Sequence, residues 1–213
     1  MSRFKVAVVA AAVCFVGVAA IAADAPPAPP AKAAPASGPV YREFVSGNAD
    51  AKVTMIEYAS LTCPHCARFN EEVMPEVRKN YIDNGKIRYV FRDYPLDALA
   101  AAAAAIARCA PGDRGKAMID LMYKNQNVWA RSPKPIDPLR GYAQLAGMSA
   151  ADVDACLANK AITGKISEVM NTASSVYKVE ATPTFFIGEE KLSGEIAYKD
   201  LAKLIDKHIA AGK

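Results

Sequence analysis

The stretch that decides the fold is Glu57 to Cys66, EYASLTCPHC, in which an apolar segment runs into a Cys-Pro-His-Cys sequence. The residues that lead into it, 52–59 (KVTMIEYA), have the apolar and aromatic character of a core strand, with Glu57 as the one misfit. The residues after it carry apolar side chains at every fourth position, on one face of a helix: Phe69, Val73, Val77 and Tyr81. The Cys-Pro-His-Cys sequence is therefore predicted to begin a helix that follows a buried strand, because Pro64 also suits a first helical turn.

The rest of the chain completes a sheet around this unit. Residues 86–92 (KIRYVFR) predict a second strand, parallel to the first because a helix joins the two. A hairpin is expected from residues 184–187 to a short strand at Leu192, and an amphipathic helix closes the chain at 198–209. The long segment between the strand groups shows almost no strand pattern and predicts five helices, at 96–109, 113–127, 138–146, 149–157 and 162–177. We predict an α/β fold with one sheet, helices on both of its faces and an all-helical insertion at about 96–160.

The first residues have the pattern of an export signal. Arg3 and Lys5 precede an uncharged, largely apolar run, which ends in a small-x-small site at Ala20-Ile21-Ala22 that a signal peptidase accepts. We predict three regions: a signal peptide at 1–22, an Ala/Pro-rich linker at 23–39 and one folded domain at 40–213. The alternative is an uncleaved N-terminal membrane anchor, since the apolar run approaches the length that spans a bilayer.

The charge balance gives no support for binding to nucleic acid or to anionic membranes. The chain has 26 Lys and Arg against 22 Asp and Glu, a formal net charge of +4. Loss of Arg3 and Lys5 with the predicted signal peptide lowers this charge to +2, because no acidic residue precedes Asp24. A balance so near neutral lacks the basic character of a polyanion-binding surface. We therefore expect no nucleic-acid partner.

Four cysteines remain after the predicted cleavage: Cys63, Cys66, Cys109 and Cys156. Outside the cytosol thiols are not kept reduced, so an even set of four favours pairing. Two of the four share one Cys-x-x-Cys motif, which leaves Cys109 and Cys156 for each other. The alternative is that Cys109 and Cys156 are buried free thiols that pack as small hydrophobic side chains.

Cysteines three residues apart on a helix face the same way, so Cys63 and Cys66 can form and break a disulfide. Cys63 would lie where the unpaired N–H groups and the dipole of the helix favour negative charge, which lowers the pKa of its thiol. Cys66 would be more enclosed and would act as the resolving thiol. Pro64 stiffens the turn, and a protonated His65 adds positive charge near Cys63. Both effects favour the reduced form, and a stable reduced form makes the disulfide a stronger oxidant.

Metal binding is the alternative use of such a motif. A structural zinc site needs four ligands, and the chain offers one Cys-x-x-Cys with two histidines, His65 and His208. We therefore expect no metal site and no cofactor other than the redox-active disulfide. A Cu(I) metallochaperone, which would hold the ion between Cys63 and Cys66, stays open as another function.

Two further positions bear on the same centre. Glu57 lies six residues before Cys63, and a buried carboxylate with a raised pKa can exchange a proton with the resolving thiol. The alternative is an edge-strand Glu57 that faces solvent. Thr182-Pro183 precedes the strand at 184–187, a place where cis X-Pro bonds are kept. A cis bond would let the backbone of Thr182 face the disulfide and pair with an extended substrate, and a trans bond is the alternative.

These segments, with residues 86–96 (KIRYVFRDYPL) and 181–195 (ATPTFFIGEEKLSGE), resemble the DsbA-type branch of the thioredoxin superfamily over nearly all of residues 40–209. The resemblance implies a thioredoxin fold with a helical insertion between its βαβ half and its C-terminal hairpin and helix. Its implied site consists of Cys63 as nucleophile, Cys66 as resolving cysteine, Glu57 as buried acid and Pro183 as a cis-proline beside the disulfide. Some members carry a structural disulfide in the insertion, where Cys109 and Cys156 lie.

The resemblance also implies a function. A periplasmic dithiol oxidase of this type introduces disulfide bonds into unfolded or reduced exported proteins and is reoxidised by a membrane quinone-linked partner of DsbB type. Thr182 departs from the enterobacterial DsbA pattern, which has Val there, and resembles the disulfide isomerases, so an isomerase or reductase is the alternative. Isomerases of this type gain avidity from an N-terminal dimerisation domain. Here an Ala/Pro-rich linker precedes Val40, which favours a monomeric oxidase.

Overall fold

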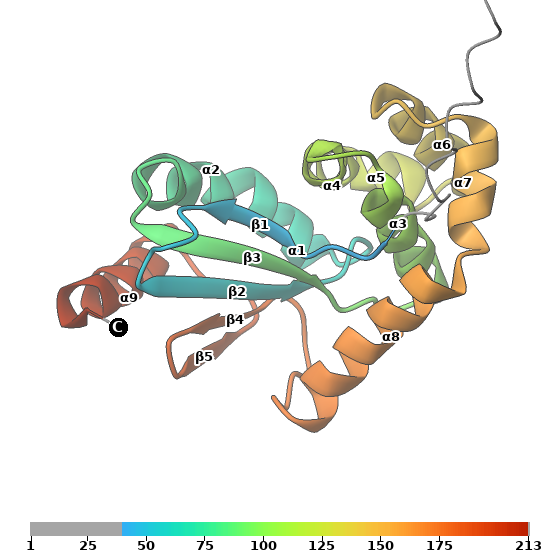
Figure 1. The fold of residues 1–213 in the computed structure, drawn as a ribbon. Coiled ribbons are helices and arrows are strands. Elements are labelled where there is room, and N and C mark those ends of the chain that lie inside the picture. Colours follow the sequence, from blue (N-terminus) through green and yellow to red (C-terminus); the bar gives the residue numbers. More distant parts are fainter. Residues whose placement is uncertain (1–39, 213) are drawn as a thin grey trace, which may run out of the picture. The chain divides into compact units, whose positions relative to one another are not determined.

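A computed structural model describes residues 40–212 of the 213-residue chain. The predicted signal peptide (1–22) and linker (23–39) lie outside the described residues. Within them, a five-stranded mixed sheet is combined with helices, and a group of helices is inserted between the two parts of the sheet (Figure 1). The predicted α/β fold with a helical insertion is confirmed. No helix in residues 40–212 is both long enough and apolar enough to cross a membrane.

The sheet has the strand order β1-β3-β2-β4-β5. Its strands are β1 (Phe44–Gly47), β2 (Val53–Ala59), β3 (Ile87–Asp93), β4 (Thr184–Ile187) and β5 (Glu190–Ser193). β2 and β3 are parallel, as the helix between them requires, and the other neighbouring strands are antiparallel. Glu57 of β2 lies between Phe91 of β3 and Phe185 of β4, so it is central in the sheet. The sequence pattern does not predict β1, because four residues are too few to show alternation.

The chain after Cys63 forms one continuous helical run beside the sheet. The run consists of α1 (Pro64–Arg68), the π-helical η1 (Phe69–Val73), α2 (Met74–Val77) and the π-helical η2 (Arg78–Ile82). Pro75 lies inside it, lacks an N–H group and crowds the carbonyl four residues earlier, and wider π-helical turns on both sides accommodate this defect. The last helix, α9 (Tyr198–Ala211), packs beside this run, where the Tyr81 hydroxyl donates to Asp206 at 3.0 Å.

Between β3 and β4 the described chain forms α3 (Ala98–Cys109), α4 (Arg114–Lys124), α5 (Gln126–Trp129), α6 (Ile136–Leu145), α7 (Ala150–Leu157) and α8 (Lys160–Ser175). Figure 1 shows α3 to α7 gathered beyond one end of the sheet, with α8 running back toward β4 and β5. The sequence pattern does not separate α5 from α4, so one helix more is present than the five predicted. A disulfide joins Cys109, at the end of α3, to Cys156 in α7.

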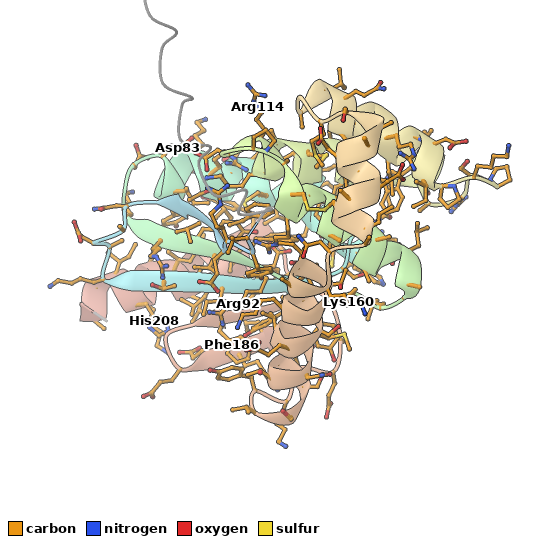
Figure 2. The ribbon with its side chains drawn as sticks, turned by 45° about the vertical axis from the view of Figure 1, so that its right-hand side comes forward. Asp83, Arg92, Arg114, Lys160, Phe186 and His208 are labelled. Carbon is orange, nitrogen blue, oxygen red and sulfur yellow. A yellow bond between two sulfur atoms is a disulfide. The ribbon has the colours of Figure 1, made fainter. Side chains whose placement is uncertain are left out.

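Alternation along β2 divides the core between the two faces of the sheet. Met55 belongs to the large cluster that includes the helical run, α9 and the insertion, whereas Tyr58 belongs to a smaller cluster with Ala173 of α8. Phe186 packs at the edge of this smaller cluster, with its ring 5.8 Å from that of Tyr58, and Figure 2 shows it beside α8. Glu57 has the parity of Met55, so its side chain points into the large cluster, on the side of the helical run.

Candidate redox site

Cys63 is the N-cap residue of α1, close after the carboxyl end of β2. Its backbone is extended, with φ −76° and ψ 120°, and Pro64 takes the first helical position. The carbonyl of Cys63 accepts the N–H of Ala67 at 3.1 Å, which closes the first turn. The N–H groups of that turn have no partner within the helix and favour negative charge at its start. The thiol of Cys63 therefore lies in the electropositive part of the helix.

The two thiols of the motif have opposite acidities. Cys63 and Cys66 are both free cysteines, 4 % and 0 % exposed. A hydrogen bond from Cys66 lowers the pKa of Cys63 to about 5 against the opposing effect of burial, with smaller contributions from the Thr182 side chain and the backbone N–H groups of Cys66 and His65. Burial, followed by the hydrogen bond to Cys63, raises the pKa of Cys66 far above its usual range. At neutral pH Cys63 is a thiolate, and Cys66 keeps its proton.

Thr182 lies directly against Cys63. The peptide bond from Thr182 to Pro183 is cis, and Sγ of Cys63 lies 3.3 Å from the Thr182 carbonyl oxygen, to which it donates while the thiol is protonated. The hydroxyl of Thr182 is buried and makes no hydrogen bond within the described residues. A free donor beside the sulfur stabilises a thiolate, which agrees with the effect of the Thr182 side chain on the pKa of Cys63.

Glu57 is a buried acid rather than an edge-strand residue that faces solvent. Its exposed fraction is 2 %, and burial raises its pKa to about 8, although a hydrogen bond from the Tyr89 hydroxyl at 2.5 Å lowers it in part. The negative charges of Asp120 and Cys63 add to the rise. The charge of Glu57 in turn raises the pKa of Cys66. Glu57 is thus mostly protonated at neutral pH and is electrostatically coupled to the resolving thiol.

The surroundings of the His65 imidazole differ from those we predicted. We expected it to act as a positive charge beside Cys63, but its side chain is about half exposed and its Nδ1 lies 2.7 Å from Oε1 of Glu195. Arg68 reaches the same carboxylate oxygen with Nε at 2.5 Å. A charge on His65 is therefore largely offset by Glu195, and His65 acts on the pKa of Cys63 through its backbone N–H.

Two residues of the insertion hold the active-site loop and were not predicted from the sequence. Gln126 of α5 donates from Nε2 to the carbonyls of Leu61 at 2.8 Å and Cys63 at 2.9 Å. The hydroxyl of Tyr123 of α4 donates to the carbonyl of Ser60 at 3.3 Å. In the sequence, Gln126 is one polar residue of a helical segment, and nothing local shows that it is buried. Its role as a donor to the loop carbonyls depends on how the insertion packs against the loop.

The arrangement is suited to thiol–disulfide exchange. One thiolate with a low pKa lies beside a thiol that keeps its proton, at the start of a helix, next to the buried carbonyl of Thr182 and near a buried acid. Within residues 40–212, no group of three or more His, Cys, Asp or Glu side chains is placed to hold a metal ion. The low pKa of Cys63 beside the raised pKa of Cys66 favours redox chemistry at sulfur.

Comparison with known proteins places the chain in a class. A family profile described as thioredoxin matches residues 41–207, and the chain belongs to this family. Among solved structures, α-DsbA1 of Wolbachia pipientis superposes with a TM-score of 0.75 at 28% identity, covering 83% of this chain and 95% of that one. BdbD of Bacillus subtilis has a TM-score of 0.72 at 18% identity, covering 81% and 99%, and supports the fold alone. The predicted DsbA-like resemblance is confirmed.

The name of one relative found by sequence comparison states an activity. A predicted protein-disulfide oxidoreductase of Rickettsia bellii is 32% identical over 173 residues, which are 80% of this chain and 66% of that protein. The chain thus spans just under two thirds of the length of this relative.

Proposed function

We propose that this protein is a periplasmic thiol–disulfide oxidoreductase that introduces disulfide bonds into reduced exported proteins through Cys63 and Cys66. The observation that carries the proposal is the opposite acidity of the two thiols, with the pKa of Cys63 at about 5 and that of Cys66 raised far above its usual range. A thiolate that is stable in the reduced form makes the disulfide an oxidant. The resemblance to DsbA and the name of the Rickettsia relative support the same activity.

The reaction balances with a client dithiol. A client thiolate attacks Sγ of Cys63, a mixed disulfide forms, and the Cys63–Cys66 bond breaks with its electron pair left on Cys66, which takes up a proton. A second client thiolate then attacks the client sulfur of the mixed disulfide and releases Cys63 as a thiolate. The client loses two electrons and the protein gains them. A membrane quinone-linked partner of DsbB type would accept those electrons and restore the disulfide.

Two single substitutions test this mechanism with a reduced peptide that contains two cysteines. Cys63→Ala is expected to abolish peptide oxidation, because it removes the sulfur that is attacked. Cys66→Ala is expected to retain Cys63 in a mixed disulfide with the peptide when the two are combined under mild oxidation, since no resolving thiol displaces it. The matched control is the double variant Cys109→Ala, Cys156→Ala, whose sulfurs lie in the insertion. Full peptide oxidation by Cys63→Ala would refute the proposal.

The direction of electron flow separates the oxidase from an isomerase or reductase of the same fold. Thr182 is the feature that favours an isomerase or reductase, because its buried hydroxyl makes no hydrogen bond within the described residues and lies beside Cys63. The redox state of the pair, fixed by alkylation as cells are lysed, decides between them. We expect Cys63 and Cys66 to be oxidised, and a pair kept reduced would instead assign the isomerase or reductase role.

A further inference from the structure

The buried acid of the site is almost completely shielded from solvent. Glu57 is 2 % exposed and Cys66 is fully buried, so a proton that moves between them has to enter and leave this pair by another group. The hydroxyl of Tyr89 on β3 lies 2.5 Å from Oε2 of Glu57 and donates to it. Tyr89 is thus a hydrogen-bonding partner through which the carboxyl can exchange a proton.

Tyr89 also borders a cavity that opens to solvent. The cavity is small, about 30 Å³, which is enough for a water molecule, and it lies between β1, β3, the helical run and α4. Asp120 and Arg78 line it with Tyr89, and their side chains are 48% and 41% exposed, so its wall reaches bulk water. Asn70 donates to Asp120 at 3.1 Å and holds the carboxylate at this wall. A neighbouring hollow shares Asn70, Arg78 and Asp120 and widens the opening.

We propose that Tyr89 is a positioning residue through which Glu57 exchanges its proton with water in this cavity. The inference rests on the proposed function. When the Cys63–Cys66 bond breaks, Cys66 takes its proton from Glu57, and the O–H of Tyr89 stabilises the carboxylate that forms. Tyr89 then passes its proton to Glu57 as it accepts one from a cavity water. On reoxidation Cys66 returns its proton to Glu57, and the same two oxygens carry it out.

The surroundings suit a relay and not a stable tyrosinate. Burial and the charge of Glu57 raise the pKa of Tyr89, so the phenol stays neutral and transfers a proton only while receiving another. The ionisable or charged groups that face the Glu57–Tyr89 pair or line the cavity are Cys63, Cys66, Arg78, Lys116, Asp120 and Tyr123. These groups also contribute to any pH profile of Glu57 and Tyr89. The variants described below do not change them.

The first test is Tyr89→Phe, which removes one oxygen and keeps the ring. Oxidised protein is mixed with glutathione, and the formation of free Cys66 is followed by alkylation after rapid quenching, across a range of pH. We expect the rate to fall roughly tenfold at neutral pH, less than the loss of a positioned acid itself would cost, because Glu57 remains in place. The midpoint of the pH profile assigned to Glu57 is expected to move up, because the carboxylate loses a hydrogen-bond donor. The shift of this midpoint reports the lost hydrogen bond to Glu57, and the fall in rate measured below both midpoints, where Glu57 holds its proton in either protein, reports the role in proton transfer.

A double-mutant cycle decides whether Tyr89 acts through Glu57. In a Glu57→Gln background, Tyr89→Phe is expected to have no further effect on the rate. Tyr81→Phe is the matched control, because it too removes a tyrosine hydroxyl that donates to a carboxylate, far from the site. An equal loss of rate in both backgrounds, or an equal loss in Tyr81→Phe, overturns the proposal. A wild-type protein that does not react with glutathione refutes the proposed function instead.

A second variant tests the water route without altering Glu57 or Tyr89. Ser46 of β1 lines the cavity, and Ser46→Met fills part of it. We expect slower steady-state turnover with a reduced peptide and glutathione disulfide, because each cycle has to restore the proton of Glu57. An unchanged turnover, with water shown to be displaced by a crystal structure of the variant, overturns the route through this cavity.

Discussion

Two identical side chains, three residues apart, have opposite acid strengths in this protein. Cys63 lies at the start of the helix with hydrogen-bond donors around it, and Cys66 lies one turn inside, fully buried beside an acid. Position within the helix, rather than residue type, therefore assigns the roles. Glu57 shows the same principle, because a carboxyl in the centre of a sheet keeps its proton at a pH where a surface carboxyl has lost it.

The free energy of unfolding of the reduced protein is predicted to depend on pH through Glu57. Its pKa is about 8 in the folded state against an ordinary value of 4.5, so the folded state holds a proton that the unfolded chain has already released. The stability that this proton contributes is complete below the unfolded pKa and is lost as the pH rises through about 8, an effect of up to about 5 kcal/mol. Glu57→Gln should lack this slope.

The measurement is urea unfolding of the reduced wild type and of Glu57→Gln at several pH values between those two pKa values. Taking the difference between the proteins cancels the contribution of Cys63, which has the opposite sign. The lowered pKa of Cys63 adds stability as the pH rises above about 5. Two parallel stability profiles would show that Glu57 does not hold a proton in the folded state.

At the scale of elements, the helical insertion does more than cover one end of the sheet. Its helices α4 and α5 supply the hydrogen bonds that hold the loop from β2 to α1, through Tyr123 and Gln126. Local patterns predicted β4 with its observed bounds, because an apolar run after Pro183 is a strong strand signal. They missed β1 and α5, since elements of four residues show too little periodicity.

Gln126→Met is predicted to lower the free energy of unfolding by about 1–3 kcal/mol, because it leaves two buried carbonyls without their donor. The rate of peptide oxidation should fall as well, since the carbonyl of Cys63 is one of the two. Gln144→Met, on an exposed face of α6, is the control and should change neither quantity. Urea unfolding and peptide oxidation measure the two effects, and equal stability of the two variants would contradict the role of Gln126.

Removal of the Cys109–Cys156 disulfide is predicted to lower stability by about 2–4 kcal/mol, because the bridge closes a loop between residues 47 apart. Activity at moderate temperature should be retained, since neither cysteine contacts the redox site. Thermal unfolding of Cys109→Ala, Cys156→Ala beside the wild type checks the first statement, and peptide oxidation checks the second. A loss of activity larger than the unfolded fraction explains would show that the redox site needs this disulfide for its activity.

On the scale of the whole molecule, Arg108 joins the insertion to the sheet and to the first described residues. Its guanidinium is fully buried on α3, donates to Asp93 at 2.7 Å and to the carbonyls of Arg42 at 2.7 Å and Phe91 at 3.2 Å, and lies 3.9 Å from the ring centre of Phe44. Each nitrogen of the guanidinium donates a hydrogen bond to an oxygen, and a charge is tolerated in the interior only when it is paired in this way. The ion pair therefore sets how α3 sits on β3.

Arg108→Met is predicted to destabilise the protein by about 3–5 kcal/mol, because it leaves the carboxylate of Asp93 buried and uncompensated. Arg140→Met is the matched control, since its ion pair with Asp154 is more exposed and should contribute much less to stability. Denaturant unfolding of both variants gives the comparison. Similar losses of unfolding free energy in the two variants would show that the buried Arg108–Asp93 pair stabilises the protein no more than an exposed pair does.

The amino-acid sequence by itself determined the βαβ unit, the place of Cys63 and Cys66 at the start of a helix, and the chemistry of the pair. These depend on spacing and periodicity over a few residues, which the chain displays without its fold. Only the tertiary structure decided that Tyr89 bonds to Glu57, that the carbonyl of Thr182 faces Cys63 and that Gln126 holds the loop. Such contacts join residues between 32 and 119 positions apart, and a hydrogen bond across that distance leaves no local pattern to read.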